Sequence, residues 1–189
     1  MDKIASFLVE LDKLKNITRK TYLNDLERFE NSAEHSWHLA MAILVFGQEM
    51  KPDLDLLHAI KIALVHDIGE IGAGDVSVYS NSHEIQAGRE EQYLKSLVSG
   101  EVPFSGEIYT LWQEYQSQDS EESKWVKVFD RFLPFLSNLN TDGRSWKDQG
   151  ISTRQVKEIN QVIKSEAPDI YSWMKEKISL AAARGWLKD

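Results

Sequence analysis

The sequence has no cysteine among its 189 residues, and this absence excludes several classes of site. Disulfides, thiolate nucleophiles, zinc fingers and iron–sulfur clusters all need cysteine, so a transition-metal site here must use imidazole and carboxylate groups. Histidine is scarce as well, with five residues. The position of each histidine is therefore informative.

Long apolar runs and an excess of basic residues are also missing. The longest apolar stretch, residues 39–46, is far shorter than the roughly 18 residues that a membrane span needs. The 22 Lys and Arg against 30 Asp and Glu give a net charge of −8, which disfavours binding to a nucleic-acid polymer. Residues 1–20 lack the apolar core and cleavage site of a secretory signal. We therefore expect a cytoplasmic protein that binds neither membranes nor nucleic-acid polymers.

No repeat or linker divides the chain, so residues 1–189 are expected to form a single domain. Apolar residues recur at spacings of three and four, and no segment alternates as a strand would. The sequence therefore predicts an all-α bundle of about six to eight helices. The later helices are expected near 83–98, 106–116, 121–139, 152–164 and 168–184. Two polar segments, 15–34 and 69–82, are expected to be long loops, which are often functional in compact domains.

Four residues of metal-ligand type are predicted to face the core. His35 lies on the apolar face of its predicted helix, and the doublet of His66 and Asp67 closes the apolar run 60–65. Asp130 shares a helical face with apolar neighbours at i−4 and i+3. Burying such polar groups is costly unless they pair with one another or bind a cation.

Two imidazoles and two carboxylates make a donor set that suits Mn²⁺, Co²⁺, Fe²⁺, Ni²⁺ or Zn²⁺ and leaves coordination positions open. Open positions favour catalysis over a structural metal. Each residue taken singly also has a structural interpretation; Asp130, for example, can pair with a neighbouring cation. Their joint placement beside two unusual loops favours the metal.

The same residues resemble a known signature. His35, the His66-Asp67 doublet about 30 residues on and Asp130 about 60 further are similar to the H…HD…D pattern of HD-domain metal-dependent phosphohydrolases. The resemblance implies one divalent metal ion, with Mg²⁺ among the candidates, held by these four residues. It extends over nearly the whole chain to blocks of the small single-domain branch related to 5′-deoxynucleotidases: residues 30–40, 63–75, 111–115, 127–136 and 143–151.

The resemblance also implies roles for three further residues. Glu70 and Asp75 match a catalytic acidic pair after the doublet, and Arg19 matches a phosphate-binding arginine. Glu70 can take a proton from an activated water, and its structural alternative is a solvent-facing loop acid. Asp75 is suited to position the water or a sugar hydroxyl, and its structural alternative is a turn residue or a helix N-cap. Arg19 offers a planar fork to phosphate, and its alternative is a solvated loop cation.

These features predict a phosphomonoesterase that releases phosphate from a nucleoside or deoxynucleoside 5′-monophosphate through a metal-activated water. The substrate class rests on the resemblance, which also implies a homodimer; the apolar segment 178–187 is a candidate interface. One alternative is an HD-type phosphodiesterase acting on a cyclic or linear phosphodiester, which would favour a second metal and further histidines. Another is a non-catalytic nucleotide-binding scaffold, which would have no need of Glu70 and Asp75.

The remaining histidines are weaker candidates. His38 lies one turn from His35 and is expected to be buried and hydrogen bonded, with a ligand role as the alternative. His58 is expected to be exposed. His83 would matter for a second metal, but it lies in a polar stretch without a second partner.

Overall fold

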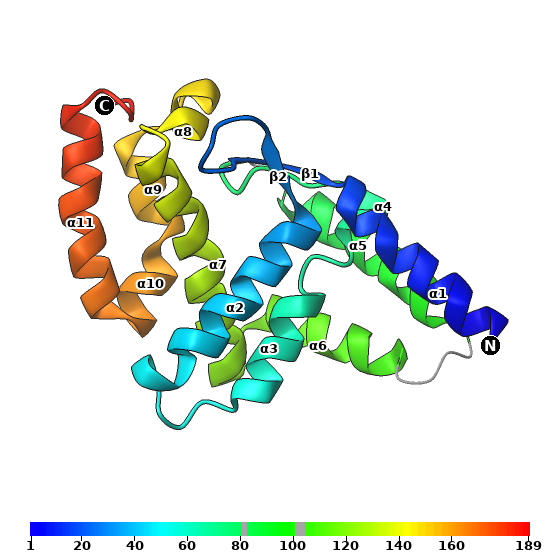
Figure 1. The fold of residues 1–189 in the computed structure, drawn as a ribbon. Helices are drawn as coiled ribbons and strands as arrows, with labels where there is room; N and C mark the ends of the chain where they lie inside the picture. Colours follow the sequence, from blue (N-terminus) through cyan, green and yellow to red (C-terminus); the bar gives the residue numbers. More distant parts are fainter. Residues whose placement is uncertain (81–82, 101–104) are drawn as a thin grey trace.

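The structure, a computed structural model, describes residues 1–80, 83–100 and 105–189, without the side chain of His83. The described residues are mainly helical (Figure 1), so the all-α prediction is confirmed. Seven helices have ten or more residues: α1 (Asp2–Asp12), α2 (Ser32–Met50), α3 (Leu56–Val65), α5 (His83–Val98), α6 (Ser105–Ser117), α7 (Glu121–Asn140) and α11 (Pro168–Ala183). Four shorter helices of the described residues bring the number above the predicted six to eight: α4 (Glu70–Ala73), α8 (Arg144–Gln149), α9 (Thr153–Ile159) and α10 (Gln161–Glu166).

The segment 15–34 was expected to be a loop, and this expectation is wrong for most of it. A 3₁₀ turn (Lys13–Asn16) leads into β1 (Thr18–Tyr22), which pairs antiparallel with β2 (Phe29–Asn31). Both strands are short and mostly polar, so they carry no alternating apolar pattern that would mark them in the sequence. The hairpin stands beside α2 and α8 (Figure 1).

The predicted helix at 152–164 is two helices, α9 and α10, which meet at Asn160. The Asn160 side-chain amide donates to the Val156 carbonyl, with an N–O distance of 2.7 Å. Such local bonds compete with the helical backbone pattern and favour a break. Helix α11 follows the prediction, with Pro168 in its first turn and Gly185 beyond its end at φ +69°.

Helix α7 is the central element, because α2, α3, α6, α10 and β1 all pack against it. Its Val126 and Val128 are fully buried, as are Ile43 of α2 and Ile62 of α3. Each helix around α7 therefore directs one face toward a common core. A polar side chain on such a face is shielded from bulk water. Among the described residues, no helix is both long and apolar enough to cross a membrane.

Two glycines of the segment 69–82 have a packing role. A Cβ atom at Gly69 would lie 2.6 Å from the Glu90 Cβ, and one at Gly72 would lie 2.4 Å from the ring of Tyr93. Only glycine allows α4 to approach α5 this closely. The segment is therefore not a loop throughout: α4 occupies its first part, and residues 74–80 are irregular, as expected.

Candidate functional site

Three buried side chains from three parts of the chain meet at the centre of the molecule. His35 comes from the first turns of α2, His66 from the end of α3 and Asp130 from α7. Their exposed fractions are 1%, 2% and 5%, and one ligand atom from each lies within 4.8 Å of the others. Asp130 Oδ1 is 3.0 Å from His35 Nε2 and 3.8 Å from His66 Nε2.

The local sequence fixes these positions. Helix α2 begins with a capping box, in which Asn31 accepts from the Glu34 backbone N–H and Glu34 accepts from that of Asn31. The cap sets the first turn of α2 so that His35 faces inward. His66 is held by its Nδ1, which is 2.8 Å from the Ala63 carbonyl oxygen.

This cluster fits a divalent cation. Because a carbonyl oxygen only accepts, His66 Nδ1 carries a proton, and in the neutral ring Nε2 then presents a lone pair. That Nε2 makes no hydrogen bond to any described residue and faces the carboxylate oxygens of Asp67, at 3.0 Å, and Asp130. Burial lowers the pKa of His66, but these two carboxylates raise it above its ordinary value. A cation, whether a proton or a metal ion, is therefore favoured at this point.

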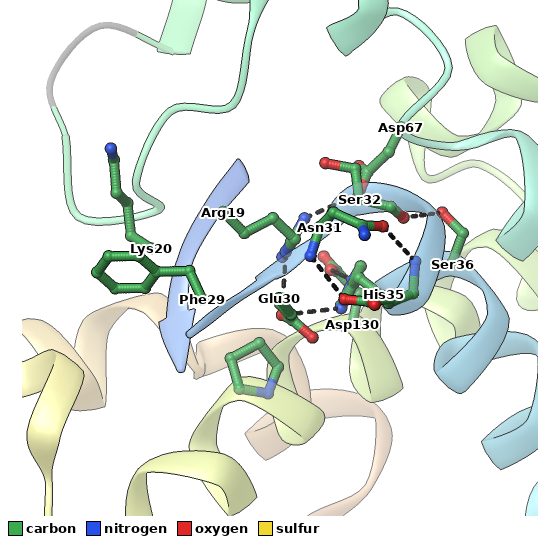
Figure 2. Close-up of polar contacts among 12 residues, drawn as sticks. Arg19, Lys20, Phe29, Glu30, Asn31, Ser32, His35, Ser36, Asp67 and Asp130 are labelled. Atoms are coloured by element: carbon green, nitrogen blue, oxygen red, sulfur yellow. Dashed lines mark hydrogen bonds and ion pairs between the residues drawn. The ribbon is translucent and has the colours of Figure 1, made fainter. Parts of the chain in front are cut away.

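Asp67 stands at the edge of the cluster and is only half-buried. Its Oδ2 accepts from Arg19 Nη1 at 2.8 Å, and Arg19 Nε donates to Glu30 Oε1 at 3.1 Å. Burial opposes ionisation of Asp67, but His66 and Arg19 hold its pKa well below the ordinary range. Figure 2 shows Arg19 reaching from β1 toward both carboxylates. With 13% of its side chain exposed, Arg19 is not a solvated loop cation, so that alternative is wrong.

The acidic pair lies close by. Glu70 is 7% exposed, and its Oε2 accepts from Ser32 Oγ at 2.5 Å, so the alternative of a solvent-facing acid is wrong. Burial and the charge of Asp67 raise the pKa of Glu70 well above its ordinary value. Asp75 is half-buried, with an Oδ2 that makes no hydrogen bond to a described residue. No described helix begins at Asp75, so it is not a helix N-cap.

A cavity of about 290 Å³ adjoins the cluster. Its lining includes Arg19, His66, Asp67, Glu70, Asp75 and Asp130, whereas His35 lies behind them. It also includes four residues that the sequence reasoning missed: Glu90, Tyr115, Lys127 and Arg131. The two cations precede and follow Asp130 on its predicted helix, so helical spacing could have found them. Glu90 and Tyr115 come from other helices and carry no such signal.

Three of these missed groups have shifted pKa values. Burial and the charge of Asp130 raise the pKa of Tyr115 well above its ordinary value. Burial, reinforced by the charge of Asp67, raises the pKa of Glu90 to about 7. Burial lowers the pKa of Lys127 to about 8, despite the nearby Asp130. Tyr115 donates its hydroxyl hydrogen to Asp130 Oδ2 at 2.6 Å. The cavity therefore combines carboxylates, cations and a buried hydroxyl beside the histidines.

His38 and His58 lie outside this cluster. His38 is exposed next to exposed Trp37, and their rings stack with centroids 6.4 Å apart, so the prediction that His38 is buried is wrong. His58 is half-exposed and pairs with Glu114 on α6. The question of a ligand role for His83 lies outside the described side chains.

Comparison with known proteins identifies relatives along most of the chain. The HD domain family matches residues 11–171. The 5′-deoxynucleotidase HDDC2 of Dictyostelium discoideum is 31% identical over 152 residues, 72% of this chain and 76% of that protein. The mouse 5′-deoxynucleotidase HDDC2 is 30% identical over 132 residues, 68% of this chain, and the chain spans only 64% of the mouse protein.

A solved structure extends the likeness to the whole fold. The crystal structure of a predicted metal-dependent phosphohydrolase from Magnetospirillum magnetotacticum has a TM-score of 0.90 and 31% identity. It covers 100% of this chain, which in turn covers 98% of that protein. The resemblance inferred from the sequence is confirmed.

Proposed function

Because the chain belongs to the HD domain family, we propose that it is a metal-dependent phosphomonoesterase acting on nucleoside or deoxynucleoside 5′-monophosphates. The observation that carries the proposal is the buried cluster of His35, His66 and Asp130, two of which line the cavity. The relatives named 5′-deoxynucleotidase support the substrate class. A cavity of about 290 Å³ suits a small ligand rather than a polymer.

In this proposal His35, His66, Asp67 and Asp130 hold one divalent ion. Imidazole nitrogens and carboxylate oxygens coordinate Mn²⁺, Co²⁺, Fe²⁺, Ni²⁺ or Zn²⁺. They also coordinate Mg²⁺ where water completes its coordination shell. When bound, such an ion polarises a phosphoryl oxygen and lowers the pKa of a coordinated water. Asp67 also binds Arg19, so the arginine orients this carboxylate toward the cluster.

Glu70 is the proposed acceptor of the water proton. The hydrogen bond from Ser32 fixes one carboxylate oxygen, and burial raises the pKa of Glu70 well above its ordinary value, which makes the carboxylate a stronger proton acceptor. Asp75 lines the same cavity with an unpaired oxygen, so it is proposed to position the water or a sugar hydroxyl. Arg19 is proposed to bind the phosphate, because its Nη2 group makes no hydrogen bond to a described residue.

The structure bears on the two alternatives. Among the described residues, one group of three or more ligand-type side chains has metal-binding geometry, which favours a mononuclear site over a dinuclear phosphodiesterase. A non-catalytic scaffold has no need of the buried Glu70 and the half-buried Asp75 at the cavity, because removing a carboxylate from water is costly. We therefore place the monoesterase first.

The test is a phosphate-release assay on metal-reconstituted protein. The panel contains ribo- and deoxyribonucleoside 5′-monophosphates, a 3′-monophosphate, a cyclic nucleotide and a linear phosphodiester. We expect release from 5′-monophosphates that requires the divalent ion. Turnover of the diesters alone would support the phosphodiesterase, and binding without turnover would support the scaffold.

We also propose that two chains associate through the outer face of α2. The helix carries no charged residue between Glu34 and Glu49, and Trp37, Leu44 and Val45 are 63%, 50% and 56% exposed. Such a stripe marks an interaction site on a water-facing helix. The segment 178–187 is a weaker candidate, because Ile178 and its neighbours on α11 pack into the chain's own core.

Sedimentation of wild-type protein and two variants tests this assembly. Leu44→Glu should yield monomers, because two buried charges would face each other across the interface. Leu180→Glu, on α11 with 40% exposure, is the matched control and should remain dimeric. Wild-type protein that sediments as a monomer at all concentrations would contradict the dimer.

A cytoplasmic location stays a prediction from the sequence.

A further inference from the structure

We propose that Lys127 and Arg131 of α7 form a second phosphate-binding group in the cavity, in addition to Arg19 of β1. We name them the α7 cation pair. Their ligand would be the phosphoryl oxygens of a phosphate monoester or of orthophosphate. The inference rests on the proposed function for its substrate, but its ligand can be tested without turnover.

The α7 cation pair lies on the helix face that carries Asp130. Helical geometry places Lys127, Asp130, Arg131 and Pro134 within about 100° on one face of α7. All four line the cavity, and only 24% of the Lys127 side chain and 20% of the Arg131 side chain are exposed. Both cations therefore lie beside the carboxylate that faces the two histidines, within reach of a group bound there.

Arg131 also lacks a hydrogen-bond acceptor within the part of the chain that the structure describes. Its Nη1 is 3.8 Å from Asp130 Oδ2, which is too far for a hydrogen bond, and it makes no hydrogen bond to any described residue. Asp130 Oδ2 instead accepts from the Tyr115 hydroxyl. Lys127 Nζ donates to that same hydroxyl at 2.7 Å and is 3.5 Å from Asp130 Oδ2. Among the described residues, the five N–H donors of the Arg131 guanidinium therefore have no hydrogen-bond acceptor, and they lie on the cavity wall.

Arg19 shows the contrast. Two of its nitrogens already donate to the carboxylates of Asp67 and Glu30, so its charge is largely matched by the protein. The nitrogens of Arg131 are reached by solvent from the cavity, and an oxyanion with several acceptor oxygens would replace that water with charge-assisted hydrogen bonds. The carboxylate of Asp130, which forms a long ion pair with Arg131, is hydrogen bonded to Tyr115 and His35, so we assign the hydrogen-bond acceptor of Arg131 to the ligand.

A structural interpretation competes with this one. Burial opposes ionisation of Asp130, but the α7 cation pair, His35 and His66 hold its pKa well below the ordinary value. In this interpretation, the only role of the pair is to keep the Asp130 carboxylate ionised. In that case, loss of Arg131 would weaken the metal site itself. If the pair binds phosphate, loss of Arg131 weakens phosphate binding while the metal is retained. The two interpretations differ in a measurement that needs no turnover.

The experiment is calorimetric titration of metal-loaded protein with orthophosphate, with metal content measured on the same samples. Wild type is compared with Arg131→Gln, with Arg131→Lys and with Arg154→Gln as a control on an arginine whose side chain is 83% exposed. We expect Arg131→Gln to raise the phosphate Kd about 10- to 100-fold with unchanged metal content, because hydrogen bonds to charged groups are lost. Arg131→Lys should be intermediate, since it keeps the charge but not the fork.

Unchanged phosphate affinity in Arg131→Gln overturns the proposal, and so does a parallel loss of metal. Should Arg131→Gln not fold, Arg131→Lys decides by the same two readings, with wild-type phosphate affinity as the overturning result. If wild type binds phosphate through Arg131 but hydrolyses no nucleotide, the proposed function fails and this assignment stands.

Discussion

Helix α3 takes part in two histidine–carboxylate clusters that look alike in composition and differ in physical character. On the outer side, His58 Nε2 is 2.8 Å from Glu114 Oε2, with side chains 37% and 21% exposed. Ser120 Oγ donates to the same carboxylate, so the group is satisfied within the protein. On the inner side, His66 joins His35 and Asp130, and their side chains are 1–7% exposed.

The difference lies in the hydrogen bonds that are not made. His66 Nε2 and His35 Nδ1 are buried without a hydrogen-bond partner among the described residues. An exposed pair such as that of His58 gains little and costs little. A buried cluster with open lone pairs is costly unless a cation completes it. Burial together with missing partners, rather than residue type, distinguishes a ligand site from an ordinary ion pair.

The largest expected effect comes from removing the shared carboxylate of the inner cluster. Asp130→Ala should lose the metal and reduce phosphate release to the level of metal-free protein, because both histidines lose the oxygen that they face. Glu114→Ala makes the same change in the outer cluster and should keep full activity. Equal activity of the two variants, each checked by circular dichroism, would remove the distinction.

Glu70→Gln should separate chemistry from metal binding. The variant keeps the hydrogen bond from Ser32 through its amide oxygen but cannot accept a proton, so kcat should fall about 10²- to 10⁴-fold. Metal content should match wild type. Activity within a few-fold of wild type would return Glu70 to a structural role; Glu158→Gln, at an exposed position, is the control.

Arg19→Gln should act mainly on substrate affinity. We expect KM to rise about 10- to 100-fold, with a smaller change in kcat, because charge-assisted bonds to the phosphate are lost. Initial rates over a range of substrate concentrations give both constants. A fall in kcat at constant KM would contradict phosphate binding and would leave the orientation of Asp67 as the only role of Arg19.

The smallest effect is expected at the outer cluster. His58→Gln should leave the metal affinity and kcat of the protein within about twofold of wild type, because a partly exposed ion pair contributes roughly 0–1 kcal/mol to stability. A melting curve should show a decrease in Tm of at most about 2–4 °C. A marked loss of metal in this variant would show that the two clusters are coupled.

The helices could be predicted because their apolar spacing is local information. The expected 83–98 agrees with α5, and 121–139 falls one residue short of α7. The hairpin could not be predicted, because two short polar strands are defined by their pairing and not by their own pattern. The break at Asn160 depends on one side-chain bond within a periodic segment.

For the site, the inward placement of His35 and Asp130 followed from helical faces, and that of His66 followed from its position at the end of an apolar run. His38 was misplaced because α2 is apolar on both sides, so apolar neighbours do not establish burial there. The partners Glu30 and Tyr115 could not be foreseen, since each reaches the site only through tertiary packing.

The most direct test of the central claim is the number of metal ions per chain at saturation, measured by elemental analysis of wild type, Asp130→Ala and Glu114→Ala. We expect one ion per chain in wild type and in Glu114→Ala, and none in Asp130→Ala. Two ions per wild-type chain, or an Asp130→Ala protein that binds its ion as tightly as wild type, would contradict it.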